Sequence, residues 1–466
     1  MKNNSTKYAE LRERYPEFLY EAFHHEWTAE GLRLWFDFRM GDVVFHPEAL
    51  FEARPFLSRD VPTQVLDRMV FDIGMIELIS YWKCACPPTV KVLCGALTDE
   101  QKAFWRKLYW NGLGEFFYTN GISESQDGFL RVESGEWSVE NGERRTENKT
   151  SQTGGSPFST LHSPLSAPYL VPIGGGKDSV VTLELLRRAG KTIRPLIMNP
   201  RGATRECARV AGFPLEEVLV IRRKIDPTLL NLNAKGYLNG HTPFSAMLAF
   251  YTRLASALSG IPNVALSNES SANESTVKGS YVNHQYSKSL EFEDDFRAYS
   301  PSFNYFSFLR PLSELQIAML FSRFTAYHDV FRSCNVGSKE DIWCGHCAKC
   351  LFAYIILSPF IAPERLNAIF GKSMLDDTTL DLEFRQLLGL AETKPFECVG
   401  TVSEVRQALQ MAVERWYKDR RPKLLEYDGT PASRRQIINL EQISPIGNLT
   451  EEERQILQQA CTEKNN

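Results

Sequence analysis

The sequence predicts an α/β protein built on a doubly wound parallel sheet, with an N-terminal α+β domain and a helical C-terminal part that contains a cysteine cluster. Three observations lead to this fold class. Apolar runs of strand and helix type alternate between residues 169 and 221, a glycine-rich turn follows the first run, and four closely spaced cysteines begin at Cys334. Alternating strands and helices bury their apolar faces best as a parallel sheet covered by helices.

Residues 1–118 carry mixed strand and helix patterns and are predicted to form the α+β domain. Charged and aromatic residues alternate at roughly helical spacing near the N-terminus, and Gly41-Asp42 separates two apolar runs in the manner of a hairpin. The elements expected are a helix over 7–25, strands over 32–40 and 43–45, an apolar helix over 71–82 and a strand over 89–94. Residues 119–167 are rich in Gly, Ser, Thr, Asn and Glu, which predicts a flexible linker or a surface insertion.

The predicted sheet domain spans residues 168–333. Its elements are a strand over 169–173, a helix over 179–189, a strand over 193–198, a helix over 205–211, a strand over 218–221, a helix from Pro243 to Leu258 with Thr242 as its N-cap, a strand beginning at Val264 and a long helix over 312–331. In a doubly wound sheet, ligands bind beyond the carboxyl ends of the strands. The loops that follow residues 173 and 266 are therefore the first places to look for a site.

The first of these loops is rich in glycine. It consists of Gly174, Gly175, Gly176, Lys177, Asp178 and Ser179, between a buried strand and a helix. Backbone N–H groups at a helix N-terminus attract a polyanion, and the expected ligand is a nucleotide phosphate. A Walker loop is excluded, because it requires glycine where Val171 stands and Ser or Thr where Asp178 stands. The alternative is a glycine-rich turn that binds nothing.

Polar residues gather after the strand that begins at Val264. Ser267, Asn268 and Glu269 follow it directly, and His284, Tyr286 and Lys288 come shortly afterwards. Polar runs usually cover a surface, but active-site loops belong at the end of such a strand. His241 precedes the helix over 243–258, where a capping or surface role and a ligand contact are equally open.

Four cysteines form the second strong motif, at Cys334, Cys344, Cys347 and Cys350. Short Cys-x-x-Cys turns place sulfurs within reach of one ion, and Zn²⁺ binds four thiolates tetrahedrally. A structural zinc site is therefore expected, with His346 as a substitute ligand, while unliganded thiols and a redox pair remain as alternatives. Residues 334–400 form the cysteine-cluster segment, with a helix from about Lys349 to Ile356, and residues 401–466 form a helical tail.

Composition limits the partners. Lys and Arg number 53 against 57 Asp and Glu, a net charge of −4, so no basic field indicates a nucleic-acid partner. No stretch of the sequence is long and apolar enough to indicate a membrane span, and the N-terminus lacks the pattern of a secretion signal. We expect a cytoplasmic protein whose ten cysteines are thiols or metal ligands. The oligomeric state has no signal in the sequence.

The glycine-rich loop resembles the pyrophosphatase loop (PP-loop) of HUP-like enzymes that split ATP into AMP and pyrophosphate, although glycine replaces the leading serine of that motif. Several segments in order resemble one narrower family, the MurL-type epimerases of peptidoglycan precursor synthesis. The segments are residues 71–75, 80–83, 174–179, 240–245, 267–269, 282–289, 343–350 and 394–400. They span nearly the whole chain except the 119–167 segment and the C-terminal tail.

This resemblance implies an ATP- and Mg²⁺-dependent inversion of the terminal L-glutamate of UDP-N-acetylmuramoyl-L-alanyl-L-glutamate, through an acyl-adenylate. On this hypothesis Gly174, Gly175, Gly176 and Ser179 cradle the phosphates, Lys177 offsets their charge, and Asp178 holds Mg²⁺ or caps the helix. The residues of 267–269 complete the nucleotide site. His284 and Lys288 are the candidates for proton transfer on the two faces, with Tyr286 and His241 as substitutes.

Two other classes of protein remain open. The first is another PP-loop adenylating enzyme, such as a nucleobase- or tRNA-modifying ligase or amidotransferase, in which the zinc motif would fit equally well. A broad basic face or an added RNA-binding domain would favour it, and the sequence shows neither. The second is a nucleotide-binding regulator without chemistry, which would bind ATP and release no pyrophosphate.

Overall fold

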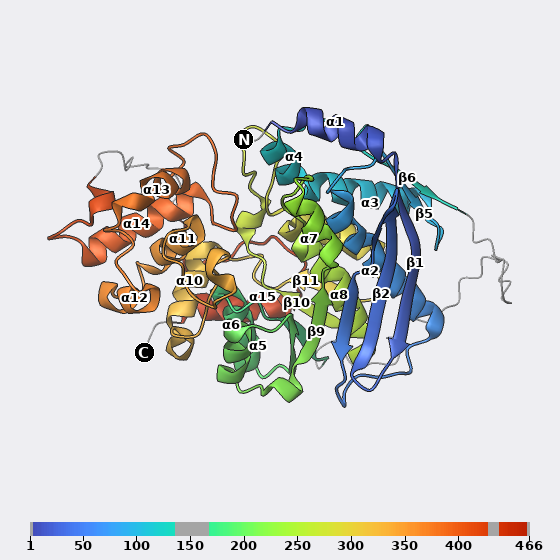
Figure 1. Ribbon diagram of the computed structural model, residues 1–466. Helices are drawn as coiled ribbons and strands as arrows, with labels where there is room; N and C mark the ends of the chain where they lie inside the picture. The colour runs from blue at the N-terminus through green and yellow to red at the C-terminus, as the bar shows by residue number, and fades with distance from the viewer. Residues whose placement is uncertain (1–2, 136–166, 427–437, 464–466) are drawn as a thin grey trace. The chain divides into compact units, whose positions relative to one another are not determined.

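The computed structural model describes residues 3–135, 167–426 and 438–463 (Figure 1). The chain divides into two compact units. Unit 1 contains the described residues of 1–167, 220–262 and 294–304, and unit 2 those of 168–219, 263–293 and 305–466. The units do not follow the predicted segment bounds, because the chain leaves unit 1 and returns to it twice.

Unit 1 is built on a mixed sheet. Its strands are β1 (Glu17–Trp27), β2 (Gly31–Met40), β3 (Val43–Phe45), β4 (Glu48–Glu52), β5 (Thr89–Val92), β6 (Arg131–Ser134) and the part of β9 (Leu219–Lys224) from residue 220 onwards. Their order is β9-β4-β2-β1-β5-β6, with β3 paired to β2. The pairs β9–β4, β4–β2 and β2–β1 are antiparallel, whereas β5 is parallel to both β1 and β6. The predicted hairpin of β2 and β3 is confirmed.

The helix predicted over 7–25 is wrong in its second half. Helix α1 covers only Ser5–Arg14, and β1 begins at Glu17. Within β1, Phe18 and Tyr20 are fully buried, and Tyr20 pairs with Phe38 of β2. Alternating aromatic residues can line a helix or one face of a strand, and here pairing with β2 and β5 selects the strand.

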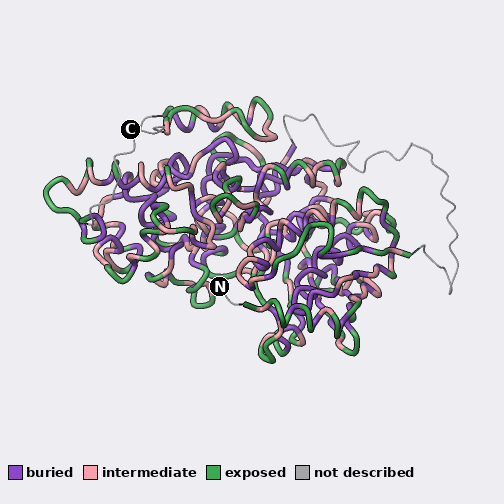
Figure 2. The backbone as a smooth tube through the Cα atoms, turned by 90° about the horizontal axis from the view of Figure 1, so that it is seen from above, coloured by how far each residue is buried: buried purple, intermediate pink, exposed green. Residues whose placement is uncertain are grey.

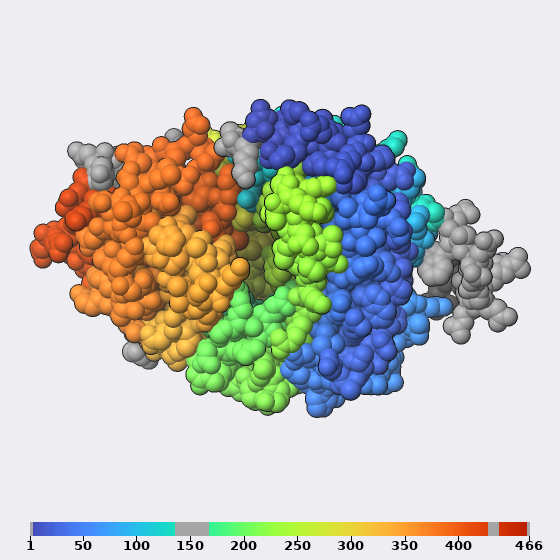
Figure 3. All heavy atoms as spheres, viewed as in Figure 1, coloured from blue at the N-terminus to red at the C-terminus, as the bar shows by residue number. Residues whose placement is uncertain are grey.

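Helices cover the strands of unit 1. They are α2 (Thr63–Trp82), α3 (Asp99–Gly112), α4 (Gly114–Asn120), α7 (Pro227–Ala234), α8 (Phe244–Ser259) and the second half of α9 (Leu290–Tyr299). Helix α2 packs on β1 and on α8, and it is buried along most of its length. Helix α7 contacts β3, and Figure 3 shows the yellow-green surface of this part of the chain beside the blue surface of the N-terminal residues.

Two predictions for unit 1 need correction. The N-cap of α8 is Pro243, and the hydroxyl of Thr242 accepts a hydrogen bond from Lys83 Nζ at 2.6 Å. The predicted linker also contains structure, because α4 continues to Asn120 and β6 pairs with β5. Phe129 and Leu130, which precede β6, are fully buried. The rest of that segment, residues 136–166, lies outside the described residues.

Unit 2 contains the strands β7 (Tyr169–Pro172), β8 (Ile193–Met198), β10 (Asn263–Leu266) and the residues of β11 (Asn304–Ser307) from 305 onwards, in the order β11-β10-β7-β8. Strand β7 is parallel to both β8 and β10. Helix α5 (Lys177–Arg188) contacts these three strands, and α6 (Gly202–Val210) follows β8. The predicted parallel strand-helix-strand unit over 169–198 is therefore confirmed.

The C-terminal part of unit 2 is helical. It contains α10 (Glu314–Ser322), α11 (Ala348–Leu357), α12 (Pro363–Phe370), α13 (Asp381–Leu387), α14 (Val402–Trp416) and α15 (Glu451–Thr462). Helix α11 packs on α10, α12, α13 and α14, and α15 packs on α5 and α10. Buried backbone is concentrated inside each unit, as Figure 2 shows. Among the described helices, none has the length and apolar composition that crossing a membrane requires.

The long helix predicted over 312–331 is wrong, because α10 ends at Ser322 and a 3-10 turn follows at Thr325–Tyr327. A straight helix would place Phe321 and Phe331 about 15 Å apart, since each residue adds roughly 1.5 Å. In the structure their ring centroids are 4.6 Å apart. Packing of these two rings therefore overrides the local helical pattern.

We expect Phe331→Ala to lower the free energy of unfolding by about 3–5 kcal/mol, because the change empties a fully buried ring site beside Phe321 and Trp343. Urea unfolding followed by circular dichroism measures the effect. Leu382→Ala is the control, because Leu382 is 62% exposed and its change should cost less than about 0.5 kcal/mol. Equal stability of the two variants would contradict this account of the break after α10.

Candidate functional site

The glycine-rich loop joins the end of β7 to the start of α5 in unit 2. Gly175 has a φ of +84°, and a Cβ there would lie 3.0 Å from Ala203 Cβ and 3.1 Å from Thr204 N. The carbonyl of Gly175 accepts a hydrogen bond from Arg332 N at 2.8 Å, which holds the loop in place. Gly176 caps α5 without a side-chain hydrogen bond. The first turn of α5 thus presents backbone N–H groups, the arrangement that favours an anion.

Lys177 is the first residue of α5, and its buried ammonium group contacts two carboxylates. It donates hydrogen bonds to Asp178 Oδ1 and to Glu314 Oε2, the latter on the first residue of α10. Lys177 and Glu314 are almost wholly buried, whereas the Asp178 side chain is 29% exposed. The lysine predicted to offset phosphate charge is therefore paired with two acids, and Glu314 is a site residue that the sequence motifs did not indicate.

One lysine shared by two acids sets their protonation. Burial raises the pKa of both carboxyl groups, but Lys177, Lys349 and Lys288 together hold the pKa of Asp178 below its usual value. Burial, with the negative charges of Asp178 and Glu269, raises the pKa of Glu314 to about 8 despite Lys177. Asp178 is thus the ionised member of the pair at neutral pH, and Glu314 is mostly protonated there.

The other predicted nucleotide residues lie in and near this cluster. Ser179 Oγ donates to Gly176 O at 3.0 Å and so closes the first turn of α5. Asn268 Nδ2 donates to Ser307 Oγ at 3.0 Å, and buried Glu269 acts electrostatically on both Glu314 and Lys288. Ser267 Oγ is buried without a hydrogen-bond partner among the described residues. The end of β10 therefore brings Glu269 toward the glycine-rich loop, as its sequence position predicted.

His284 and Lys288 both contact the thiol of Cys398, a residue that no sequence motif indicated. Cys398 accepts a side-chain hydrogen bond from Lys288 and is hydrogen-bonded to His284. Lys349 Nζ donates to the carbonyl oxygen of Cys398. Burial raises the pKa of the Cys398 thiol, but Lys288, the His284 hydrogen bond and Lys349 outweigh it and lower the pKa to about 6. A thiolate therefore predominates at neutral pH.

Cys398 lies in the segment 394–400, which the sequence analysis used only for its resemblance. The segment is held against the polar run, because Gln285 Nε2 donates to Val399 O at 3.3 Å and Lys394 N donates to Thr276 O at 3.3 Å. A single cysteine outside any metal spacing gave no other signal. Its partners become visible only when the chain folds.

The two substitute residues have other partners. Tyr286 is buried, and its ring makes an edge contact with Phe292 at a centroid distance of 6.2 Å. His241 belongs to unit 1, where its Nδ1 lies 3.4 Å from Glu115 Oε2 and where Lys83 Nζ donates to the carbonyl of the preceding Gly240.

The four predicted cysteines converge in unit 2. Cys334 Sγ lies 3.9 Å from Cys347 Sγ, Cys344 Sγ lies 3.7 Å from Cys350 Sγ, and all four sulfurs are within 4.8 Å of one another. Tetrahedral zinc with Zn–S bonds of about 2.3 Å requires sulfurs about 3.8 Å apart. His346 is exposed, and its Nδ1 is 2.9 Å from Cys344 O, so it does not join the sulfurs. The donor set therefore fits zinc through the four thiols alone.

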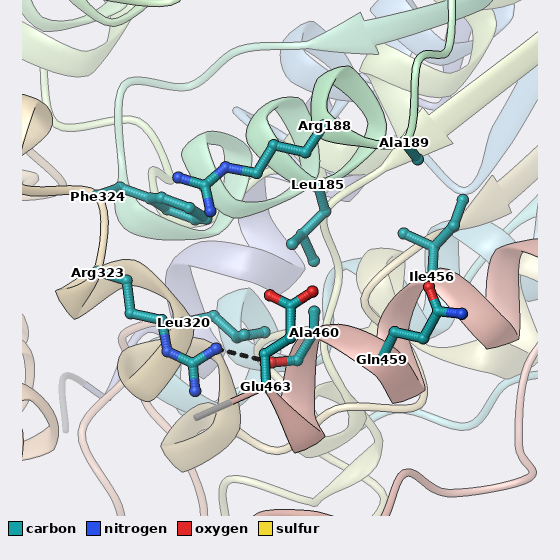
Figure 4. Close-up of a pocket in the computed structure, with 10 residues that line it drawn as sticks. All are labelled: Leu185, Arg188, Ala189, Leu320, Arg323, Phe324, Ile456, Gln459, Ala460 and Glu463. Atoms are coloured by element: carbon teal, nitrogen blue, oxygen red, sulfur yellow. Dashed lines mark hydrogen bonds between the residues drawn. The ribbon is translucent and has the colours of Figure 1, made fainter. Parts of the chain in front are cut away.

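A separate small cavity of about 110 Å³ lies between α5, α10 and α15 (Figure 4). Leu185, Leu320 and Ile456 line it together with Arg323, which donates to Ala460 O at 2.7 Å. None of the loop or thiol residues lines this cavity. Charged and polar side chains, those of Arg188, Gln459 and Glu463, share the lining with the apolar ones.

Fold and site together define an α/β protein in which a glycine-rich strand-to-helix loop is flanked by buried acids, lysines and a reactive thiol. Comparison with known families narrows this class. The MurL N-terminal domain model matches residues 9–308, and the MurL C-terminal domain model matches residues 330–429. The chain belongs to the MurL family.

Three relatives carry the name UDP-N-acetyl-alpha-D-muramoyl-L-alanyl-L-glutamate epimerase. The protein from Salinispora tropica is 37% identical over 366 residues, which cover 76% of this chain and 75% of the relative. The protein from Micromonospora sp. is 35% identical, with 76% and 77% covered. The protein from Xanthomonas oryzae pv. oryzae is 35% identical over 362 residues, with 74% and 75% covered.

We expect Gly175→Ala to destabilise the loop by about 1–2 kcal/mol, because alanine disfavours the left-handed backbone and its methyl group would press on the backbone of α6. Thermal unfolding measures the loss. Gly174→Ala is the matched control, because a Cβ at Gly174 meets nothing within 4 Å and its backbone is not left-handed. A Gly175 variant as stable as the Gly174 variant would show that the loop does not require this conformation.

Proposed function

We propose that this chain inverts the terminal L-glutamate of UDP-N-acetylmuramoyl-L-alanyl-L-glutamate to D-glutamate, in peptidoglycan precursor biosynthesis. The observation that carries the proposal is its membership of the MurL family together with three relatives named for this reaction, each 35–37% identical over about three quarters of both chains. The substrate is a small molecule, and the reaction is an isomerisation at one carbon.

The chemistry requires the glutamate to be activated. A proton α to a carboxylate is hard to remove, because the resulting carbanion would lie beside a negative charge. An acyl-adenylate removes that charge and supplies an electron sink, so we propose that ATP is split to AMP and pyrophosphate in the reaction. Support comes from the glycine-rich loop, whose resemblance to a PP-loop accords with cleavage between the α- and β-phosphates.

The loop residues would hold the nucleotide. The N–H groups of Gly174, Gly175 and Gly176 would bind phosphate oxygens at the N-terminus of α5. Asp178 and Glu314 would hold Mg²⁺, which prefers carboxylate oxygens and would bind Glu314 in place of its proton. Bound Mg²⁺ supplies charge neutralisation for the phosphates. Ser267, with its buried hydroxyl, and Glu269 would complete the nucleotide site from the end of β10.

The decisive experiment incubates the full chain with ATP, Mg²⁺ and the L-glutamate precursor and determines the chirality of glutamate after hydrolysis of the product. We expect D-glutamate to appear, with AMP and pyrophosphate formed alongside it. Lys177→Ala should abolish AMP formation, because it leaves Asp178 and Glu314 without their shared cation. Recovery of L-glutamate alone, under conditions in which the precursor is bound, would refute the epimerase proposal.

A structural zinc ion is the second component of the proposal. Cys334, Cys344, Cys347 and Cys350 would hold it, and it would fix the start of α11, where Cys347 Sγ already accepts from Cys350 N. We expect about one zinc per chain by elemental analysis, and Cys350→Ser should lose the metal and lower the melting temperature. Cys461→Ser, at a buried thiol of α15, is the control that should retain zinc. Full-length protein that is folded and free of zinc would refute this assignment.

A further inference from the structure

Among the described residues of unit 2, three cysteines lie outside the four-cysteine cluster: Cys207, Cys398 and Cys461. Of these, only Cys398 is not enclosed in the core. Cys207 and Cys461 are buried, and burial raises the pKa of each thiol to about 12. Cys398 is only half-buried. It therefore has the electrostatic environment that makes a thiol reactive, in a residue that the core does not wholly enclose.

Three separate elements converge on Cys398. Lys288 closes a 3-10 turn and donates to the thiol, and His284 comes from the loop before that turn. Lys349, in the first turn of α11, donates to the carbonyl oxygen of Cys398. The acid next to it in sequence is Glu397, whose pKa is raised by burial, so this carboxyl group opposes the thiolate less than an ordinary glutamate would.

The segment that carries the thiol also runs past the acids of the glycine-rich loop. A Cβ built on Gly400, two residues after Cys398, would lie 3.1 Å from Glu314 Cγ. Lys288, the donor to Cys398, also acts on the charge of Asp178 in the first turn of α5. The thiol thus belongs to the same charged cluster as the loop, where a carboxyl group activated by the nucleotide would lie.

We propose that the Cys398 thiolate removes the α-proton of the adenylated glutamyl residue, with Lys288 and His284 as the residues that hold the thiolate. The inference rests on the proposed function. In this step the Cα–H bond breaks, the proton forms the S–H bond of Cys398, and the electron pair moves into the acyl carbonyl to give an enolate. A proton from solvent water is then added to Cα from the opposite face, and the Cys398 thiol loses its proton to solvent. Water then cleaves the acyl–phosphate bond, which releases AMP and the D-glutamyl carboxylate.

This assignment changes the roles expected from the sequence. His284 and Lys288 were candidates for the two opposite faces, but both bind one sulfur and so serve the same face. Lys288 is a poor base here, because the thiol and two acids, Glu269 and Asp178, raise its pKa further although burial alone would lower it. The thiolate, in contrast, is matched to proton transfer near neutral pH.

The test uses the full chain with ATP, Mg²⁺ and the L-glutamate precursor in D₂O. It follows α-deuterium incorporation by mass spectrometry and adenylation by ATP–pyrophosphate exchange. We expect Cys398→Ser to lower deuterium incorporation by about 10²-fold or more, the usual contribution of a general base, and to change ATP–pyrophosphate exchange far less. Cys94→Ser is the matched control, because Cys94 is also half-buried but its pKa is raised by burial to about 12.

A chemical readout that does not depend on turnover accompanies this test. Alkylation of Cys398 by iodoacetamide, mapped by peptide mass spectrometry, should rise with pH around a midpoint of about 6, because only the thiolate reacts. Lys288→Met should move the midpoint upward, since the thiolate then loses its cation. A Cys398 midpoint of 8 or above in the unaltered chain would overturn the proposal.

The outcomes separate this inference from the proposed function. If Cys398→Ser incorporates α-deuterium at the rate of the unaltered chain, the role of the thiol is overturned and the epimerase proposal still stands. An acyl adduct of the precursor on Cys398, seen by intact mass, also overturns it, because the thiol would then be an acyl acceptor. If the unaltered chain shows neither α-deuterium incorporation nor ATP–pyrophosphate exchange, the proposed function is refuted, and the thiol assignment with it. Loss of deuterium incorporation with adenylation retained supports both.

Discussion

The site depends on one buried lysine shared between two acids. Lys177 begins α5 and Glu314 begins α10, so the two helices meet at their N-termini through an ion pair that also includes Asp178. Helix N-termini favour carboxylates, but beside this single ammonium group only Asp178 is ionised at neutral pH, because burial keeps the proton on Glu314. Breaking such a buried pair typically costs about 3–5 kcal/mol, so the arrangement also fixes how α10 packs on α5.

The same cluster extends toward the thiol through lysines rather than acids. Lys288 acts on Asp178 on one side and binds Cys398 on the other, and Lys349 holds the backbone of Cys398. Asp178 and Glu314 could hold a metal ion that binds phosphates, and they therefore belong to one cluster with a thiolate that could accept a proton. An adenylating epimerase needs both properties, because activation makes the α-proton removable and a base of moderate strength then removes it.

The four-cysteine cluster is connected to the thiol site through helix α11. Cys347 caps α11, whose second residue is Lys349. Any ion that ties the four sulfurs together therefore fixes the start of α11 and with it the lysine that holds Cys398.

The sequence by itself determined the parts that are local. A buried strand, three glycines and an amphipathic helix predict the loop from Tyr169 to Arg188, and short cysteine spacings predict the sulfur cluster, because each pattern lies within a few turns of chain. Periodicity alone did not distinguish a helix from a strand over Glu17–Trp27, nor find the break after Ser322, because β-pairing and ring packing decided both. The partners of the site were likewise decided by tertiary structure. Lys177 and Glu314 are 137 residues apart, and Cys398 acquires its character only from Lys288, His284 and Lys349, because an electrostatic environment is made by whatever the fold brings near.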